Sequence, residues 1–234
     1  MNEVVLCFDT ETTGRVEPEV IEAAWVRLVA PSSLVPIERF YARYRPTKPI
    51  ELGAMATHHI MDEDLADCPP CGTFSLPVDT AYLIGHKVDY DWEVAGKPNV
   101  RRICTLALAQ KIWPEADSHT LSSLMYLLER ERARDLIQNA HAADADVDNC
   151  VRVLGHIITR LGVTDWETLW RHSESARVPE IMPFGKHKGD RIDSIPPDYK
   201  RWLLGQPDVD PYLVMALKGE RPAAVPAPAI KTKP

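Results

Sequence analysis

The chain begins with a short apolar segment that runs directly into two acidic residues. Every residue from Val4 to Phe8 is apolar, and Asp9 and Glu11 follow with Thr10 between them. A strand that is apolar at every position is covered on both faces, as in the centre of a sheet flanked by helices. Because side chains alternate along a strand, both carboxylates leave on one face. The segment therefore predicts a core strand that ends in a paired acidic site.

This pair of carboxylates indicates a metal site. Two carboxylates held close together at the edge of a core repel each other and raise each other's pKa unless a cation lies between them. No Lys or Arg is beside Asp9 or Glu11, and their hard oxygen ligands suit Mg²⁺ or Mn²⁺. The Thr12-Thr13-Gly14 turn that follows leaves room for a phosphate. An Asp-x-Glu motif alone also fits a strand that ends in a polar turn, so the other acidic motifs decide between the two.

The alternation of apolar and polar segments predicts an α/β fold. Further strands are expected at 82–84, 20–29 and 37–44, the last two as an antiparallel meander. Helices are expected at 106–112, 121–128 and 143–161, with short helices and loops at 52–65. The helix at 143–161 has apolar residues at helical spacing and ends near Gly162, so it should pack onto the sheet.

Two further motifs place an acid after a histidine with four residues between them. They are His86 with Asp91, and His141 with Asp146. If His141 and Asp146 were both helical, they would lie about 140° apart around the helix axis and could not face one target. We therefore place His141 on the loop before the helix. Asp146 then belongs to the first turns of the helix, where the helix dipole favours an anion.

The C-terminal part of the chain differs from the part before it. Residues 164–180 are polar and aromatic with little periodicity, which predicts a linker between an N-terminal domain at 1–163 and a second unit. A tight strand and turn followed by two short helices predict a small accessory module at 181–219. The tail at 220–234 is rich in Pro and Ala, cannot bury a core, and is expected to be disordered.

Charge and cysteine content indicate where the protein works. The net charge of −7 argues against a protein that coats nucleic acid by bulk electrostatics, but residues 181–234 carry a net +3 and residues 1–180 a net −10. A small basic module could restore affinity for a polyanion. No segment is apolar enough to span a membrane, and we find no export signal. Five cysteines, an odd number, fit reduced thiols, so we expect a cytoplasmic protein.

Taken in order, the acidic motifs resemble those of a known enzyme family. Asp9-x-Glu11, then Asp91, then His141-x₄-Asp146 make four acids and a histidine, and their order is more specific than any one of them. This set resembles the proofreading-type (DEDDh) 3′ to 5′ exonucleases. The likeness extends over roughly two thirds of the chain, from its first strand to the end of the helix at 143–161.

Other segments are similar to one branch of this family, the exodeoxyribonuclease X-like enzymes. These segments are 56–60 (Ala-Thr-His-His-Ile), 103–105 with 113–114, and above all 184–189 (Phe-Gly-Lys-His-Lys-Gly) followed by Tyr199 and Trp202. The last of them lies in the predicted accessory module. By resemblance, that module favours DNA as the partner.

The resemblance implies a fold, a reaction and a set of roles. The fold is a ribonuclease H-like mixed sheet flanked by helices. The reaction is hydrolysis of DNA from its 3′ end, in single strands or at the 3′ ends of a duplex, with two Mg²⁺ or Mn²⁺ ions and release of nucleoside monophosphates. The implied metal ligands are Asp9, Glu11, Asp91 and Asp146, and His141 is the implied general base.

Substrate contacts are expected beside this set. We assign them to Thr12 and Thr13 on the turn after the first strand, and to His58 and Ile60 in the segment at 56–60. The turn leaves room for a phosphate to approach, whereas the assignment of His58 and Ile60 follows from the resemblance.

The second motif departs from the family pattern at one position. Lys87 stands where the family usually has Asn after the histidine, and Asp89 is an additional acid. Tyr90 matches the aromatic residue that commonly precedes the ligand, so Asp91 rather than Asp89 is the expected ligand. The departure at Lys87 bears on a substrate contact and not on the metal site.

Two alternative functions remain open. An RNA-trimming exonuclease would use the same acids and histidine, because this set does not distinguish the two sugars. A nucleic-acid-binding protein without activity belongs to another class. The complete set of acids argues against it, and so does the acidity of residues 1–180, which makes the chain a poor binder without metals.

Overall fold

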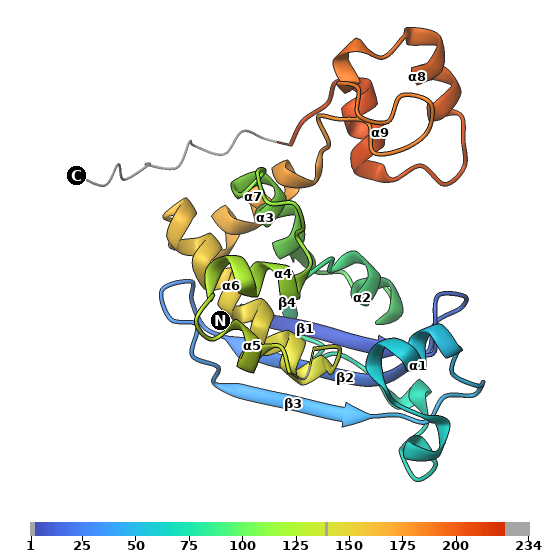
Figure 1. Ribbon diagram of the computed structural model, residues 1–234, viewed down its shortest axis with the longest axis vertical. Coiled ribbons are helices and arrows are strands. Elements are labelled where there is room, and N and C mark those ends of the chain that lie inside the picture. The colour runs from blue at the N-terminus through green and yellow to red at the C-terminus, as the bar shows by residue number, and fades with distance from the viewer. Residues whose placement is uncertain (1–2, 139, 223–234) are drawn as a thin grey trace.

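The computed structural model describes residues 3–138 and 140–222 (Figure 1). At its centre is a five-stranded mixed sheet with the strand order β3-β2-β1-β4-β5. The strands are β1 (Val4–Thr12), β2 (Val20–Leu28), β3 (Glu38–Arg43), β4 (Thr80–Gly85) and β5 (Arg101–Cys104). The pairs β1–β2 and β2–β3 are antiparallel, whereas β1–β4 and β4–β5 are parallel. The predicted mixed sheet is confirmed, and the first strand lies in its middle.

Helices connect and cover these strands. The α-helices are α1 (Leu52–His58), α2 (Asp89–Val94), α3 (Thr105–Ile112), α4 (Leu121–Leu128), α5 (Ala133–Leu136), α6 (Ala143–Leu161), α7 (Trp166–Arg177), α8 (Pro197–Leu204) and α9 (Pro211–Lys218). Short 3₁₀ turns are η1 (Asp62–Leu65), η2 (Cys71–Thr73) and η3 (Ile192–Ser194). Within the described residues, no helix is long and apolar enough to cross a membrane.

The two faces of β1 bury different clusters. Cys7 belongs to the larger core, which includes α6, and its thiol lies 3.9 Å from the carbonyl oxygen of Val147. Phe8 points the other way and stacks on Phe74, with 5.9 Å between the ring centroids. Because the alternation continues along the strand, Asp9 and the next odd-numbered residue extend the face that carries Cys7. The paired acids therefore leave β1 on the side of α6.

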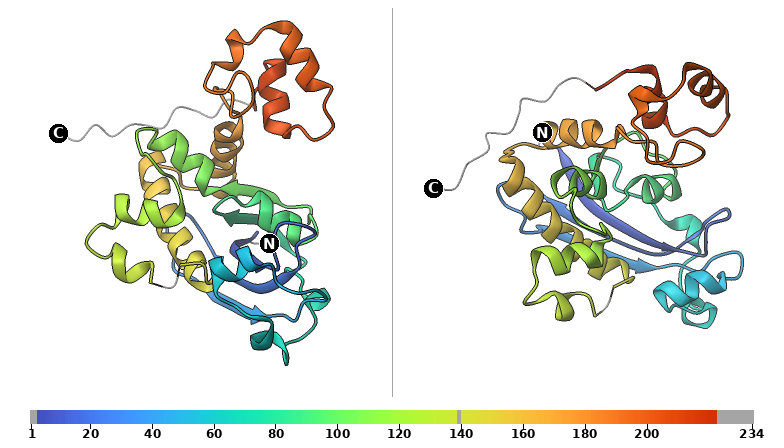
Figure 2. Two further views of the ribbon diagram at one scale, coloured as in Figure 1. Left: turned by 45° about the vertical axis from the view of Figure 1, so that its right-hand side comes forward. Right: turned by 45° about the horizontal axis from the view of Figure 1, so that its top comes forward.

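The helix α6 lies across the sheet against β1 and β2 (Figure 2). It begins at Ala143, as the apolar spacing predicts, and it ends at Gly162, whose φ of 65° is the left-handed conformation that glycine adopts easily. Its buried residues include Val147, Cys150 and Leu154, which repeat every three or four positions. This stripe fixes the rotation of the helix and points its first turn at the acidic end of β1.

The segment predicted as a linker differs from the expectation, because it contains the helix α7. Asp165 caps this helix by accepting a hydrogen bond of 2.8 Å from the Thr168 N–H. Trp166 and Leu169 are buried in the main core, and the helix packs against β5 and α3. Its buried positions form a narrow stripe among charged residues. The segment is polar overall, and this is why its sequence predicts a linker instead of a helix.

The C-terminal module has a small core of its own. The buried members are Val178, Met182, Ile192, Ile195, Leu203, Leu213, Ala216 and Leu217. The helices α8 and α9 form as predicted, but the segment at 184–189 is a series of turns instead of a strand and a turn. In Figure 1 the module, in orange and red, lies apart from the sheet beyond α7. Most of the predicted disordered tail, 223–234, lies outside the described residues.

Candidate active site

The site lies where β1 extends past its parallel neighbour. Pairing of β1 with β4 ends at Cys7 and Ile84, whereas its pairing with β2 continues to Thr12. Beyond Cys7, one edge of β1 therefore has no strand beside it. The chain leaves β4 through a turn in which Lys87 has a φ of 71°, and α2 begins two residues later. This geometry lets α2 cover the open edge of β1.

Asp91 on α2 fills this gap. One of its carboxylate oxygens accepts a hydrogen bond from the Thr10 N–H at 3.1 Å and another from the Thr10 hydroxyl at 2.7 Å. The side chain of Asp89 instead pairs with Arg102 and, at 3.4 Å, with Arg177. Of the two acids that the second motif offers, Asp91 therefore lies at the end of β1, and Asp89 ties α2 to β5 and α7.

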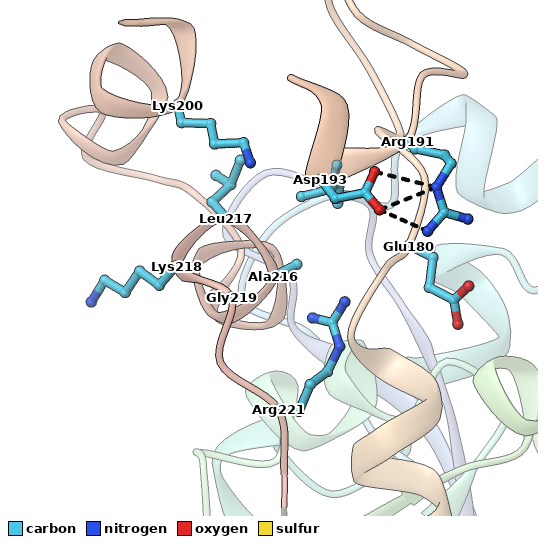
Figure 3. Close-up of a pocket in the computed structure, with 10 residues that line it drawn as sticks. Glu180, Arg191, Asp193, Lys200, Ala216, Leu217, Lys218, Gly219 and Arg221 are labelled. Carbon is cyan, nitrogen blue, oxygen red and sulfur yellow. Dashed lines mark hydrogen bonds and ion pairs between the residues drawn. The ribbon is translucent and has the colours of Figure 1, made fainter. Parts of the chain in front are cut away.

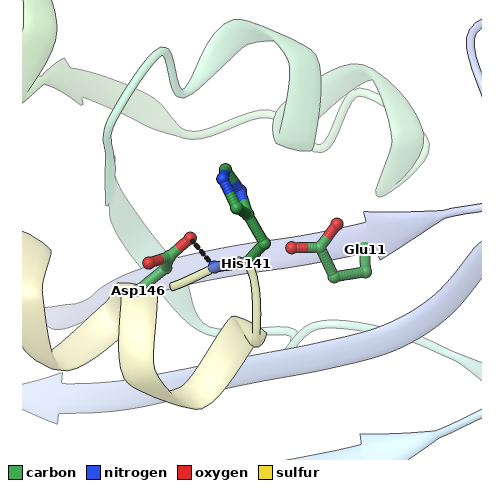
Figure 4. A group of neighbouring side chains, drawn as sticks. All are labelled: Glu11, His141 and Asp146. Atoms are coloured by element: carbon green, nitrogen blue, oxygen red, sulfur yellow. Dashed lines mark hydrogen bonds between the residues drawn. The ribbon is translucent and has the colours of Figure 1, made fainter. Parts of the chain in front are cut away.

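The third motif reaches the same place from the other side. His141 precedes α6 in the left-handed conformation, with a φ of 68°, so the prediction that it is not helical is confirmed. Its N–H donates to the Asp146 carboxylate at 3.2 Å. Potential ligand atoms of Glu11, His141 and Asp146 lie within 4.8 Å of one another (Figure 4). His141 is exposed, whereas both acids are half-buried.

All four predicted acids have raised pKa values, and burial is the largest cause at each of them. Burial is the largest cause at Asp9, followed by the charges of Asp91, Asp146 and Glu11. Burial and the neighbouring acids raise the pKa of Glu11 to about 8, and burial raises that of Asp91 to about 7. The pKa of Asp146 is also raised by burial, although the His141 N–H opposes the shift. A proton or a cation must therefore neutralise this cluster at neutral pH.

The donor set fits a hard divalent cation. Asp9, Glu11, Asp91 and Asp146 offer carboxylate oxygens, which are the ligands that Mg²⁺ and Mn²⁺ prefer. Metal binding would replace the protons that these acids otherwise hold, because only the ionised carboxylates are ligands. A bound metal ion would therefore relieve the repulsion between the carboxylates and lower their pKa values.

A first prediction follows from the protons held by these acids. In the unfolded chain the carboxyl groups titrate near pH 4, whereas Glu11 and Asp91 keep their protons to about pH 8 and 7 in the folded protein. The folded state then binds more protons, so stability should fall as pH rises from about 5 to about 8. The melting temperature measured in EDTA should fall over this range and recover with Mg²⁺. A flat or rising profile in EDTA would contradict the prediction.

The residues expected to contact substrate lie around the same strand end. The Thr12 hydroxyl is 2.6 Å from the Tyr90 hydroxyl, and the Thr13 hydroxyl accepts from the Glu19 N–H at 3.1 Å. Both threonines are buried, so their hydroxyls hold the turn in the structure shown. Their predicted contacts with substrate remain predictions.

His58 and Ile60 differ in what they offer a ligand. The Nδ1 atom of His58 accepts from the Ile60 N–H at 3.0 Å, and its Nε2 atom has no partner within the part of the chain that the structure describes. Burial lowers the pKa of His58, so the neutral ring is favoured. Ile60 is 3% exposed and packs with Ile21 and Leu65. That burial assigns Ile60 a packing role, while its contact with substrate stays untested.

One residue that matters for the site was not anticipated. Glu22 on β2 is fully buried and lies opposite Glu11 in the strand register. Its carboxylate accepts hydrogen bonds from the Tyr41 hydroxyl at 2.8 Å, the Arg43 Nε–H at 2.7 Å and the Ala143 N–H at 2.8 Å. Glu22 thereby fixes the first residue of α6 to the sheet. A lone acid inside an otherwise apolar strand was the available signal.

We expect Glu22→Gln to weaken the attachment of α6. An amide supplies a poorer acceptor for three donors, and a hydrogen bond to a charged group contributes about 1.5–3 kcal/mol. The melting temperature should fall, amide exchange at Ala143 should accelerate, and turnover should fall more than KM changes because Asp146 is misplaced. Glu38→Gln, an exposed acid paired with Arg27, is the matched control. Unchanged exchange at Ala143 would remove Glu22 from this role.

Comparisons with known proteins give a consistent result. Over 219 aligned residues the chain is 26% identical to exodeoxyribonuclease 10 of Escherichia coli (strain K12). The alignment covers 90% of this chain and 95% of that protein. The structure of exonuclease X in complex with 5′-overhanging duplex DNA matches with a TM-score of 0.55 and 22% identity, covering 72% of this chain and 99% of that chain. No protein-family model matches the chain.

A second solved structure extends the similarity in fold. A zinc-bound complex of Escherichia coli exonuclease I with single-stranded DNA matches with a TM-score of 0.56 and 15% identity, over 95% of this chain and 62% of that chain. These structural matches establish the ribonuclease H-like fold. The resemblance predicted from the motifs is therefore confirmed as a similarity: in sequence the chain is similar to exodeoxyribonuclease 10, and in fold it is similar to exonuclease X and exonuclease I.

Proposed function

We propose that this protein is a metal-dependent 3′ to 5′ exonuclease that removes nucleoside monophosphates from DNA. The observation that carries the proposal is the group of Glu11, Asp146 and His141, whose potential ligand atoms lie within 4.8 Å of one another. Asp9 adjoins this group, because the charges of Asp91, Asp146 and Glu11 raise its pKa. The similarity to exodeoxyribonuclease 10 and to exonuclease X in complex with duplex DNA supports DNA as the substrate.

The acids are proposed to hold two Mg²⁺ or Mn²⁺ ions. When bound, such ions stabilise the charge that develops on the attacking and leaving oxygens of an in-line displacement. Asp9 and Glu11 are placed by the rigid central strand, and Asp91 is oriented by its two hydrogen bonds from Thr10. Asp146 is oriented by the His141 N–H. The cage is thus assembled from elements whose own packing fixes it.

His141 is the proposed general base. Its imidazole is exposed beside Glu11 and Asp146, so it can accept a proton from a water molecule that attacks the scissile phosphate. It lies on a loop and not on the helix, which lets the ring adjust as substrate enters. Histidine suits this role because its unperturbed pKa is near neutral.

The division of labour along the chain is also proposed. Residues 1–163 would carry the chemistry, and 181–219 would form an accessory module. The helix α7 joins them, since Tyr212 of α9 donates to Glu174 at 2.9 Å and also bonds Arg177. Thr12, Thr13, His58 and Ile60 remain the proposed substrate contacts within the first unit.

A direct experiment tests the reaction and its direction. The protein is incubated with DNA and RNA single strands labelled at the 3′ or the 5′ end, with Mg²⁺ and with EDTA. We expect immediate release of the 3′ label as a mononucleotide, a ladder of shortened 5′-labelled DNA, and no reaction in EDTA. Faster cleavage of RNA would favour the RNA-trimming alternative. Release of the 5′ label first would overturn the proposed direction.

A further inference from the structure

The C-terminal module carries a group of three aromatic rings, one exposed and two half-buried, that the proposed chemistry does not use. Tyr199 on α8 lies between His187 and Trp202, with ring centroids 4.6 Å and 5.3 Å away. Trp202 is 56% exposed. We call His187, Tyr199 and Trp202 the ring cluster. Trp202 is the ring of this cluster with an open face on which a planar ligand could stack.

The ring cluster is held by a closely fitted turn. The Gly189 N–H donates to the Met182 carbonyl and the Met182 N–H to the Asp190 carbonyl, both at 2.9 Å. Gly185 has a φ of 73°, and a Cβ there would lie 2.8 Å from the Tyr199 hydroxyl. Only glycine therefore lets the turn approach α8 this closely. The rings are presented in a fixed arrangement, so little ordering is needed on binding.

Positive charge lies beside the rings and is not neutralised. Among the described residues, Lys186, Lys188 and Lys200 form no ion pair. The nearby arginines do: Arg191 pairs with Asp193 at 2.8 Å, and Arg201 pairs with Asp198. The free positive charge of this surface is thus carried by lysines on the turn and on α8.

Further positive charge lines a pocket of the same module, which shares Lys200 with this surface. It lies between α9 and the Arg191–Asp193 pair, and Lys200 reaches towards it from α8 (Figure 3). Arg221 lines it as well, whereas Glu180, another lining residue, is already paired with Lys111. The cations that remain unneutralised in the pocket therefore outnumber the acids.

We infer that the ring cluster and the adjacent lysines bind single-stranded nucleic acid by stacking bases on the rings and pairing phosphates with the ammonium groups. Exposed aromatic rings next to lysines are the combination that binds single strands without regard to sequence. A protein partner is less well matched, because lysine is depleted at protein interfaces. The inference deepens the proposed function and rests on it for the identity of the substrate.

The negative charge of residues 1–180 explains why a separate binding surface for a polyanion would be useful. Residues 1–180 carry a net charge of −10, so the part with the acidic site repels a polyanion. Residues 181–234 carry a net +3 and the described part of them, 181–222, a net +1, and the free lysines lie beside the rings. A strand held there would keep its end near the site through many encounters, which raises affinity without altering the chemical step.

The test measures binding without turnover. In EDTA, the full chain is titrated with a labelled oligothymidine of about 20 nucleotides and with an abasic oligonucleotide of equal length. Trp202→Ala should weaken oligothymidine binding by about 5- to 100-fold and abasic binding little, because only the first offers bases to stack. Trp202→Phe should restore most of the affinity. Tyr126→Ala, an exposed ring on α4, is the matched control.

The contribution of the lysines is tested by removing one positive charge and measuring the salt dependence of binding. Lys188→Ala should weaken binding of both oligonucleotides and flatten the salt dependence by a slope of about 0.7, whereas Lys111→Ala, whose lysine is paired with Glu180, should not. Equal affinities of wild type and Trp202→Ala for oligothymidine would overturn the inference and favour a protein partner. Turnover of a dinucleotide, measured separately with Mg²⁺, should be unchanged in Trp202→Ala. If the wild type binds as expected but fails to shorten the oligothymidine in Mg²⁺, this inference holds and the proposed function fails.

Discussion

Replacing Asp9 by alanine is expected to abolish hydrolysis and to leave the metal-free fold as stable as before, or more stable. Asp9 lies among Asp91, Asp146 and Glu11, and burial together with these charges raises its pKa. Removing it relieves repulsion that the folded protein otherwise has to balance with protons. The same removal deletes a carboxylate from the proposed metal cage, so activity should be lost at ordinary Mg²⁺ concentrations.

Loss of activity without loss of stability distinguishes an acid that binds a metal from an acid that stabilises the fold. Removing a structural acid such as Asp89, which pairs with Arg102 and Arg177, should lower the melting temperature. Asp9→Asn keeps the shape of the side chain and should behave like Asp9→Ala. Asp144→Ala, an exposed acid in the first turn of α6, is the matched control and should stay active. An Asp9→Ala variant with a near-normal rate at ordinary Mg²⁺ concentrations would exclude Asp9 from the cage.

Local sequence patterns were sufficient for the centre of the fold. An apolar run followed by Asp9 and Glu11 predicts a buried strand and the face on which both acids leave, because alternation is a property of the backbone alone. The spacing around α6 likewise predicts its start and its end at Gly162. In both cases the signal lies within one element. No partner from elsewhere in the chain is needed to interpret it.

The elements that were missed depend on distant contacts. The helix α2 is six residues long, and it is held in place by hydrogen bonds that Asp91 accepts from Thr10 and that Asp89 accepts from Arg102. The helix α7 buries Trp166 in a core made by other elements. Such short or mostly polar helices gain their stability from tertiary packing, which a single-sequence pattern does not contain.

The role of Glu22 also depends on distant contacts that a local sequence pattern does not contain. Its three donors come from β3 and from the start of α6, more than a hundred positions away in the last case. From sequence, a lone acid on a strand is compatible with a bulge, an edge or an unpaired surface position. Only the register with Glu11 and the position of α6 show that it attaches the two elements behind the site.

The second large effect is expected at His141. His141→Ala should lower turnover by about 10² to 10⁴, as for loss of a general base, while metal binding is retained. Raising the pH should partly restore the rate, because hydroxide then replaces water that needs deprotonation. A ligand role is the alternative, since a ring nitrogen of His141 lies within 4.8 Å of ligand atoms on Glu11 and Asp146. Turnover and Mn²⁺ affinity, the latter by calorimetric titration, therefore have to be measured on the same variant.

The left-handed backbone at His141 makes a second variant necessary as a control. His141 has a φ of 68°, a conformation that alanine tolerates less well than asparagine. His141→Asn keeps that conformation and removes the base, so any extra loss in His141→Ala reports a displaced loop instead of missing chemistry. The Asp146 carboxylate accepts from the backbone N–H of residue 141, and that bond survives both substitutions. A fall in Mn²⁺ affinity shared by both variants would make His141 a ligand; an unchanged affinity with a large loss of turnover would leave it as the base.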